Sequence, residues 1–230
     1  MTTRLLLFDI DGTLVLTGGA GKRAISRAFH ELFGVPDAFD GVSLSGRTDR
    51  HLVERALERC GVATTPQALA QVRDRYLMRL AEAIHEPAQG RQAVLPGVLP
   101  LLDALDGVPR LQTALLTGNY ATGARIKLEH FDLWRRFAWG AFGDEHAERN
   151  ELAVAAMAEA SRRGVPLRQR SHAIVIGDTP FDVACARAAG ANVIAVATGG
   201  HPVDELRACG ADAVFEDLTD LDAVLAAIEA

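Results

Sequence analysis

The sequence predicts an α/β fold with a parallel sheet at its core and a helical module inserted near the start of the chain. Two observations favour this fold. Short apolar runs that are typical of buried strands alternate with helical patterns through the second half of the chain. A long stretch near the beginning shows helical patterns and no comparable apolar run. Strands that alternate with helices indicate a parallel sheet.

Five apolar runs predict the strands of this sheet. The first, Leu5–Phe8, is continuously apolar, as expected for a strand that is buried on both of its faces. The later runs, of which the last is weaker, are Thr113–Leu116, Ala173–Ile176, Val193–Val196 and Ala213–Phe215.

Two helices are predicted between these strands. The first covers Asn150–Arg163, which is rich in alanine and is followed by Gly164 as a stop. The second covers Pro180–Ala189, which begins with proline at a first-turn position and ends before Gly190.

The helical module is predicted from three apolar stripes at helical spacing. They are Ile25, Phe29 and Leu32; Leu52, Ala56 and Leu57; and Leu69, Val72, Tyr76 and Leu80. The glycine-rich segment Gly18–Gly21 and the segment Leu95–Gly97 are predicted to be its two linkers. We therefore expect residues 1–16 and 95–230 to form an α/β core and residues 17–94 to form a helical cap, which is a candidate lid.

Charge and cysteine content narrow the class of protein. The chain has 24 Lys and Arg against 30 Asp and Glu, a net charge of −6, which argues against a nucleic-acid partner because phosphate contacts need clustered basic residues. Its three cysteines are too scattered for a disulfide framework or a zinc site. We expect a cytoplasmic protein, because no signal peptide and no apolar stretch near the roughly 20 residues of a membrane span are present.

Three of the predicted strands end in polar clusters, at Asp9–Thr13, Thr117–Asn119 and Gly177–Asp182. Ligands of open α/β sheets bind outside the carboxyl ends of the strands, so these clusters are expected to converge in one crevice. Several carboxylates close together repel one another unless a cation lies among them. Oxygen ligands favour a hard cation, Mg²⁺ being the expected one. The sequence thus predicts metal-assisted phosphoryl transfer with a carboxylate nucleophile.

These clusters resemble three motifs of one known family. Phe8–Leu14, which contains DxDGT, Leu115–Asn119 and Ile176–Asp182 resemble the first, second and fourth motifs of the haloacid dehalogenase superfamily of phosphohydrolases. The motifs follow the family's order over essentially the whole chain, and the inserted helices resemble its small helical cap. The resemblance, to the phosphoglycolate phosphatase-like and beta-phosphoglucomutase-like branch, implies a Rossmann-like core, Mg²⁺ and a small phosphorylated metabolite as substrate, with phosphoglycolate as a candidate.

The resemblance also implies catalytic roles. Asp9 would be the nucleophile and form an aspartyl-phosphate. Asp11 would protonate the leaving oxygen and then deprotonate the hydrolytic water. Thr117 would hydrogen-bond a phosphoryl oxygen, helped by the amide of Gly118. Gly12 and Asn119 are expected to join Gly118 in binding the substrate.

The metal ligands implied by the resemblance come from two motifs. Asp178 would bind Mg²⁺ together with the carboxylate of Asp9 and the backbone carbonyl of Asp11. Asp182 would support the surroundings of the metal. An ordinary first-turn acid, favoured by the helix dipole, is the alternative for Asp182.

The family's third motif, a lysine that neutralises the phosphoryl charge, is not found in its commonest place. The segment Asp144–Asn150 holds no lysine, and Lys22 and Lys127 are the only two in the chain. We expect Lys127 to take this role, with Arg149 as the substitute. A solvated helix lysine is the alternative for Lys127.

The cap contains the loop Ser45–Arg50, which carries glycine, arginine and threonine just before a helical pattern. Arg47 and Thr48 are predicted to contact the substrate, with Arg47 pairing an anionic group. The alternative is a surface turn with a helix N-cap at Ser45 or Thr48.

The leading function is a phosphomonoesterase that is a monomer or homodimer. A sugar-phosphate mutase is the first alternative, although the segment Leu16–Gly21 lacks the histidine that such mutases usually carry. A signalling receiver domain and an inactive binding protein are alternatives from other classes. Dehalogenation and phosphonate cleavage are disfavoured, because neither uses an acid at the position of Asp11.

Overall fold

The computed structural model describes residues 3–36 and 38–230, and within them a six-stranded sheet forms the core. The sheet has the strand order β5-β4-β1-β6-β7-β8, and every neighbouring pair is parallel. The strands are β1 (Arg4–Phe8), β4 (Leu111–Leu116), β5 (Gly140–Ala141), β6 (Ala173–Gly177), β7 (Asn192–Val196) and β8 (Ala213–Phe215). The predicted α/β fold with a parallel sheet is confirmed.

Strand β1 lies at the centre of the sheet and is buried on both faces. Leu5 and Leu7 pack under α6 (Arg149–Arg162) and α7 (Pro180–Ala189). Leu6 and Phe8 face the opposite layer, because side chains alternate along a strand. That layer contains α4 (Val98–Leu105), α5 (Ala121–His130) and α9 (Leu221–Glu229). The continuous apolar run that predicted this strand is therefore the consequence of two covered faces.

The remaining elements are short and peripheral. Helix α8 (Val203–Ala208) packs against β7 and β8, and two 3₁₀ turns cover Trp134–Arg136 and Arg170–His172. Strand β5, which pairs with Leu115 and Leu116, was not predicted, because two residues make no recognisable apolar run. No helix among the described residues is long and apolar enough to cross a membrane.

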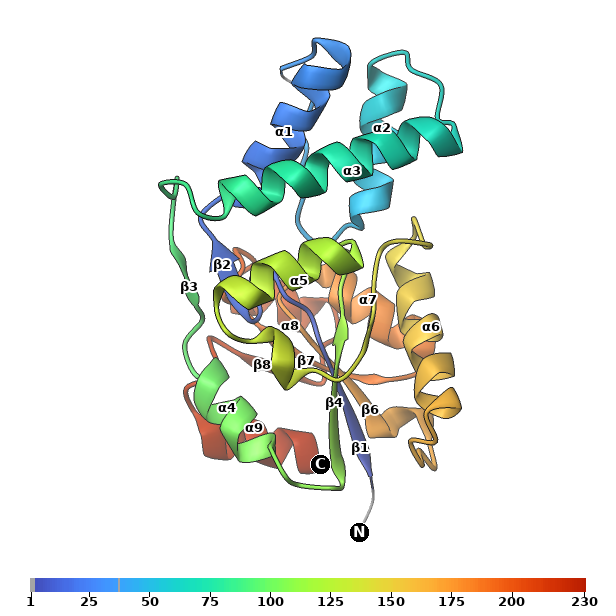
Figure 1. Ribbon diagram of the computed structural model, residues 1–230. Helices are drawn as coiled ribbons and strands as arrows, with labels where there is room; N and C mark the ends of the chain where they lie inside the picture. The colour runs from blue at the N-terminus through green and yellow to red at the C-terminus, as the bar shows by residue number, and fades with distance from the viewer. Residues whose placement is uncertain (1–2, 37) are drawn as a thin grey trace.

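Over its described residues, the inserted module is a cap of three helices, α1 (Ala20–Phe33), α2 (Asp49–Arg59) and α3 (Pro66–Ala83). Figure 1 shows these helices above the carboxyl ends of the sheet strands. The predicted stripes form the cap's own core, which includes Phe29, Leu57 and Leu80. Tyr120, from the loop before α5, packs into this cap core and joins the two parts of the molecule.

The cap is connected to the sheet by a short antiparallel ribbon, β2 (Val15–Thr17) paired with β3 (Gln92–Val94). Part of the predicted entry linker is helix instead, because α1 begins at Ala20 with Gly19 as its N-cap at φ 77°. The chain thus enters the cap through the ribbon and a left-handed glycine turn. The division into residues 1–16 with 95–230 and 17–94 remains a prediction.

Candidate active site

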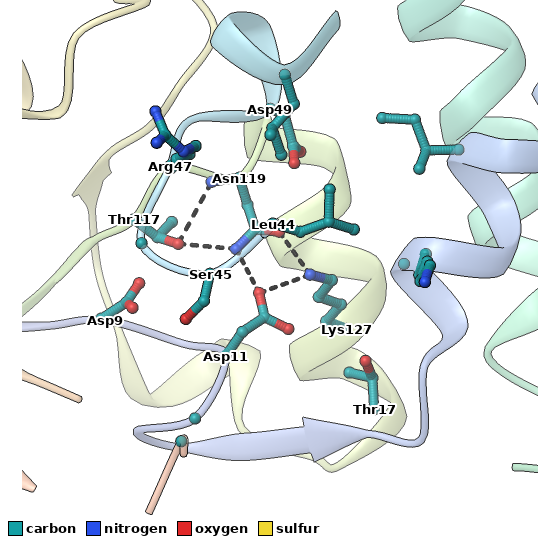
Figure 2. Close-up of a pocket in the computed structure, with 18 of the residues that line it drawn as sticks. Asp9, Asp11, Thr17, Leu44, Ser45, Arg47, Asp49, Thr117, Asn119 and Lys127 are labelled. Carbon is teal, nitrogen blue, oxygen red and sulfur yellow. Dashed lines mark hydrogen bonds and ion pairs between the residues drawn. The ribbon is translucent and has the colours of Figure 1, made fainter. Parts of the chain in front are cut away.

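The loops after β1, β4 and β6 converge on one cavity of about 230 Å³ beneath the cap. Most of the predicted site residues line it; they are Asp9, Asp11, Gly12, Arg47, Thr117, Gly118, Asn119, Lys127, Arg149 and Asp178. Figure 2 shows Asp9, Asp11 and Thr117 on the sheet side and Asp49 on the cap side. The convergence that the strand ends predicted therefore occurs.

The side chain of Asp9 is buried against Arg149. Nη2 of Arg149 lies 3.2 Å from Oδ2 of Asp9, and the same group donates a hydrogen bond to Oδ1 of Asp182. Burial raises the pKa of Asp9 to about 6, while the Arg149 charge opposes this shift and the Asp182 and Asp11 charges add to it. Burial alone would lower the pKa of Arg149, but the two carboxylates hold it above its usual range. Asp9 is therefore an anion at neutral pH, with a fixed cation beside it.

Asp11 belongs to a separate hydrogen-bond network. Lys127 Nζ donates to Oδ2 of Asp11 and to Oδ1 of Asn119, at 2.6 Å each. The amide nitrogen of Asn119 donates to Asp11 Oδ2 and to Thr117 Oγ1, both at 2.8 Å. The dashed lines in Figure 2 trace these contacts. Asn119 thus connects the acid of the first motif to the hydroxyl of the second, and Lys127 contacts Asp11 whereas Arg149 contacts Asp9.

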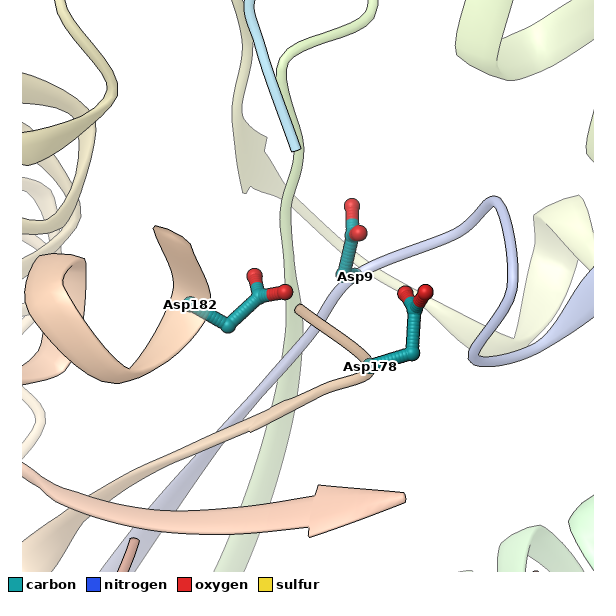
Figure 3. A group of neighbouring side chains, drawn as sticks. All are labelled: Asp9, Asp178 and Asp182. Carbon is teal, nitrogen blue, oxygen red and sulfur yellow. The ribbon is translucent and has the colours of Figure 1, made fainter. Parts of the chain in front are cut away.

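Three buried carboxylates lie close enough to share a cation. Asp9, Asp178 and Asp182 each place an oxygen within 4.8 Å of the others. Figure 3 shows these three neighbouring side chains. Asp178 Oδ1 accepts a hydrogen bond from Thr13 Oγ1 at 3.1 Å, but among the described residues its buried Oδ2 has no partner. Burial, and then the neighbouring charges of Asp182 and Asp9, raise the pKa of Asp178 to about 9. An unpartnered oxygen among repelling acids fits a divalent cation.

Asp182 is committed to protein contacts on both of its oxygens. Its Oδ2 accepts from the backbone N–H of Thr179 at 3.0 Å and from Thr179 Oγ1 at 2.7 Å, which completes a capping box at the start of α7. Its Oδ1 accepts from Arg149. Asp182 thus acts as a first-turn acid and also holds the cation that faces Asp9.

Two glycines make room for the Asp178 carboxylate. A Cβ on Gly12, which has φ 86°, would lie 2.5 Å from Asp178 Oδ2, and a Cβ on Gly199 would lie 1.6 Å from the same oxygen. Gly199 was missed by the sequence analysis. It lies in the Thr198–Gly200 turn after β7, so a polar, glycine-rich cluster at a fourth strand end was the signal that could have found it.

The predicted cap loop contacts the core directly, but its residues divide into two groups. Thr48 is buried and does not line the cavity: it caps α2 by accepting from His51 N–H at 3.0 Å and donates to Ala147 O at 2.7 Å. Arg47 is exposed, and its guanidinium lies 5.2 Å from the centre of the Phe181 ring. The Thr48 hydroxyl is therefore occupied in joining cap to core, as the N-cap alternative predicted.

Close contact with this loop also explains the glycine at position 118. The carbonyl of Gly118 accepts from the backbone N–H of Asp49 at 2.7 Å. A Cβ on Gly118 would lie 2.2 Å from Arg47 O, so only glycine allows the loop to approach this closely. Asp49 and Tyr76 also line the cavity, although the sequence analysis did not select either of them.

Comparison with known proteins agrees with this geometry. A model of the family described as haloacid dehalogenase-like hydrolase matches residues 6–196. The chain belongs to this family. Curated relatives include the phosphoglycolate phosphatases of Rhodospirillum rubrum, 30% identical over 220 residues (95% of this chain and 89% of the relative), and of Pseudomonas fluorescens, 27% identical over 208 residues (88% and 73%).

Solved structures show the same fold. A hydrolase from Pseudomonas syringae superposes with a TM-score of 0.74 at 24% identity and covers 99% of both chains. CbbY from Rhodobacter sphaeroides, in complex with phosphate, superposes with a TM-score of 0.71 at 21% identity and covers 96% of both chains. A parallel-sheet core with a helical cap is thus the architecture of the family to which the chain belongs.

Proposed function

We propose that the protein is a Mg²⁺-dependent phosphomonoesterase that hydrolyses a small phosphorylated metabolite through an aspartyl-phosphate on Asp9. One observation carries this proposal: the Asp9 carboxylate lies 3.2 Å from the guanidinium of Arg149 and within 4.8 Å of a carboxylate oxygen of Asp178, whose Oδ2 has no partner among the described residues. Such an arrangement suits an ionised nucleophile that attacks a phosphorus atom whose oxygens are neutralised.

The reaction follows from the side chains in the cavity. An oxygen of Asp9 attacks phosphorus, and the bond from phosphorus to the ester oxygen breaks. Asp11, protonated on the oxygen that Lys127 and Asn119 do not contact, gives this proton to the ester oxygen. It later takes a proton from the water that attacks the aspartyl-phosphate, which releases inorganic phosphate and restores both Asp9 and the protonated Asp11. Asp11 can reach a substrate because its side chain is 42% exposed and lines the cavity. Thr117 and the Gly118 amide would hydrogen-bond the phosphoryl oxygens.

Mg²⁺ would be held by the carboxylates of Asp9 and Asp178 and the backbone carbonyl of Asp11, with Asp182 outside this set. When bound, Mg²⁺ supplies positive charge that neutralises the negative charge of the phosphoryl oxygens. Arg149 holds Asp9 ionised and in place. Lys127, which we propose to be catalytic, holds Asp11 against Asn119 at the edge of the same cavity.

The alternatives predict different products. Among the described residues, those that line the cavity include no histidine, which favours hydrolysis over the mutase alternative as the sequence did. A receiver-like domain would keep the phosphoryl group on Asp9. Phosphoglycolate is one candidate substrate, because the curated relatives carry that name.

The test is phosphate release from p-nitrophenyl phosphate and a panel of phosphate monoesters with Mg²⁺, using Asp9→Asn as the blank. We expect turnover well above one phosphate per protein molecule. Stoichiometric labelling without turnover would support the receiver alternative, and isomerisation of a sugar phosphate without release would support the mutase.

A further inference from the structure

A buried carboxylate outside the proposed machinery faces the same cavity. Asp49, in the first turn of α2, is 9% exposed and lines the cavity from the cap side, as Figure 2 shows. Its Oδ2 accepts from the backbone N–H of Tyr120 at 2.9 Å, and its own N–H donates to Gly118 O at 2.7 Å. Because Tyr120 follows Asn119, which binds Asp11, these contacts fix Asp49 near the reacting groups.

Of the cations that line the cavity, Lys22 and Arg47 are exposed at its rim, and the two buried ones are engaged with other acids. Arg149 pairs with Asp9 and Asp182. Lys127 pairs with Asp11, and its attraction for Asp49 opposes the burial that raises the pKa of Asp49 to about 6. Asp49 is therefore an anion at pH 7.5. A second anionic group placed beside it would meet repulsion in a partly desolvated space.

Two hydrogen-bond donors line the same cavity as Asp49. A Cβ on Gly21 would lie 3.7 Å from Lys127 Nζ and 3.8 Å from the Tyr76 hydroxyl, so both groups border the same part of the cavity. Burial raises the pKa of Tyr76 well above its usual value, and the Asp49 charge adds to the shift, so the phenol keeps its proton. Lys127 uses two of its three N–H groups on Asp11 and Asn119.

The cavity thus offers an acceptor and two donors beyond the phosphoryl site. A hydroxyl group both donates and accepts, whereas a carboxylate only accepts and an ammonium only donates. We propose that Asp49 is a specificity-determining residue that selects phosphate esters whose carbon chain carries a hydroxyl group at this place and rejects those that carry a carboxylate. The inference rests on the proposed phosphatase function, and it ranks phosphoglycolate below a hydroxylated ester of the same length.

Two matched pairs of esters test this selection at pH 7.5. The first pair is 2-hydroxyethyl phosphate and phosphoglycolate; the second is glycerol 3-phosphate and 3-phosphoglycerate. Each pair differs only in a terminal CH₂OH or carboxylate, and ethyl phosphate, which has neither group, is the reference. In at least one pair, we expect the kcat/KM of the wild-type enzyme for the hydroxylated ester to exceed that for the carboxylated ester by about tenfold or more. This is the size of effect expected from one charge-assisted hydrogen bond.

The variant is Asp49→Asn, which removes the charge but keeps an oxygen that can accept from Tyr120 N–H. We expect it to lower the ratio of hydroxylated to carboxylated ester about tenfold, chiefly by improving the carboxylated one, while kcat/KM for ethyl phosphate changes less than about twofold. Asp74→Asn is the matched control, because Asp74 is a cap acid whose side chain is 67% exposed. It should change no ratio.

The outcomes separate the two proposals. If wild-type enzyme releases phosphate from ethyl phosphate but shows no preference in either pair, or if Asp49→Asn leaves both ratios unchanged, the assignment of Asp49 is overturned and the phosphatase function stands. If no ester is hydrolysed, including p-nitrophenyl phosphate, the phosphatase function fails and this inference fails with it.

Discussion

Arg149 Nη2 lies 3.2 Å from Asp9 Oδ2, and both side chains are only 6% exposed. The guanidinium also bonds Asp182, which in turn caps α7 through Thr179. The nucleophile proposed for catalysis is thus held by a chain of contacts that runs from the start of α6 to the start of α7. A cation in this place keeps Asp9 ionised although burial favours its protonated form.

The first prediction concerns the nucleophile. Asp9→Asn should lower phosphate release by several orders of magnitude, because an amide of nearly the same shape cannot attack phosphorus. Circular dichroism should show an unchanged fold. Retention of more than about a tenth of wild-type activity would contradict the role of Asp9, given the size of such effects.

The second prediction separates the two buried cations by the step that each one serves. Arg149 contacts the proposed nucleophile alone, so Arg149→Ala should slow chiefly the formation of the phospho-enzyme. Lys127 contacts Asp11, which is proposed to serve both steps, so Lys127→Ala should slow hydrolysis of the phospho-enzyme as well as its formation. Losses on the order of 10²–10³ are expected when a buried cation near transferred charge is removed.

Rapid-quench measurements of phospho-enzyme check this ordering. The sequence predicts Lys127 for the third-motif role, with Arg149 as the substitute, whereas the contacts place each cation beside a different acid. If both variants slow the same step to the same extent, the two cations act as one unit and the contacts do not separate their roles.

The third prediction concerns stability and pH. The pKa of Asp49 is about 6 in the folded protein, against 3.8 for the free group. Between these values the folded state binds more protons than the unfolded state, so the free energy of unfolding falls as pH rises from 4 to 6. Asp49→Asn should therefore stabilise the protein at pH 7, by about 1–3 kcal/mol.

Urea unfolding at pH 7 and at pH 4 measures this difference, since at pH 4 the carboxyl is protonated in the folded state and about half protonated in the unfolded state. The stabilisation by Asp49→Asn should be largest at pH 7 and small at pH 4. An equal effect at both pH values would mean that the substitution acts through packing, and that the charge of Asp49 does not lower the free energy of unfolding.

The sequence predicted many of the elements that have a strong local signal, although helices α4, α8 and α9 were not among the predictions. The strand β1 can be recognised in the sequence because both of its faces are covered, which makes its residues continuously apolar. The motifs at Asp9, Thr117 and Asp178 can be recognised because each follows a buried strand. Strand β5 and the ribbon of β2 and β3 were missed, because two or three residues carry too little pattern. The pairing of β2 with β3 depends on where the cap is inserted, and the pairing of β5 depends on the neighbouring strand β4.

The missed site residues depend on contacts between distant parts of the chain. Asp49 is an ordinary first-turn acid when seen alone, and it becomes a cavity residue only because the cap loop packs on Gly118. Likewise, no local sequence pattern indicates that Lys127 contacts Asp11 while Arg149 contacts Asp9. Those pairings are set by how α5 and α6 lie on opposite faces of the sheet.

The last prediction concerns the space beside the proposed metal ligand. A Cβ on Gly199 would lie 1.6 Å from Asp178 Oδ2, so Gly199→Ala must displace either this carboxylate or the turn after β7. We expect Mg²⁺ affinity, measured by calorimetry and by Mg²⁺ titration of activity, to fall about 10- to 100-fold, as when the surroundings of a metal ligand are disturbed. Gly90→Ala is the matched control, because a Cβ there meets nothing within 4 Å and the residue has no positive φ. Unchanged Mg²⁺ affinity in Gly199→Ala, at a stability equal to that of the control, would mean that the Asp178 oxygen facing Gly199 is not the one that binds the cation.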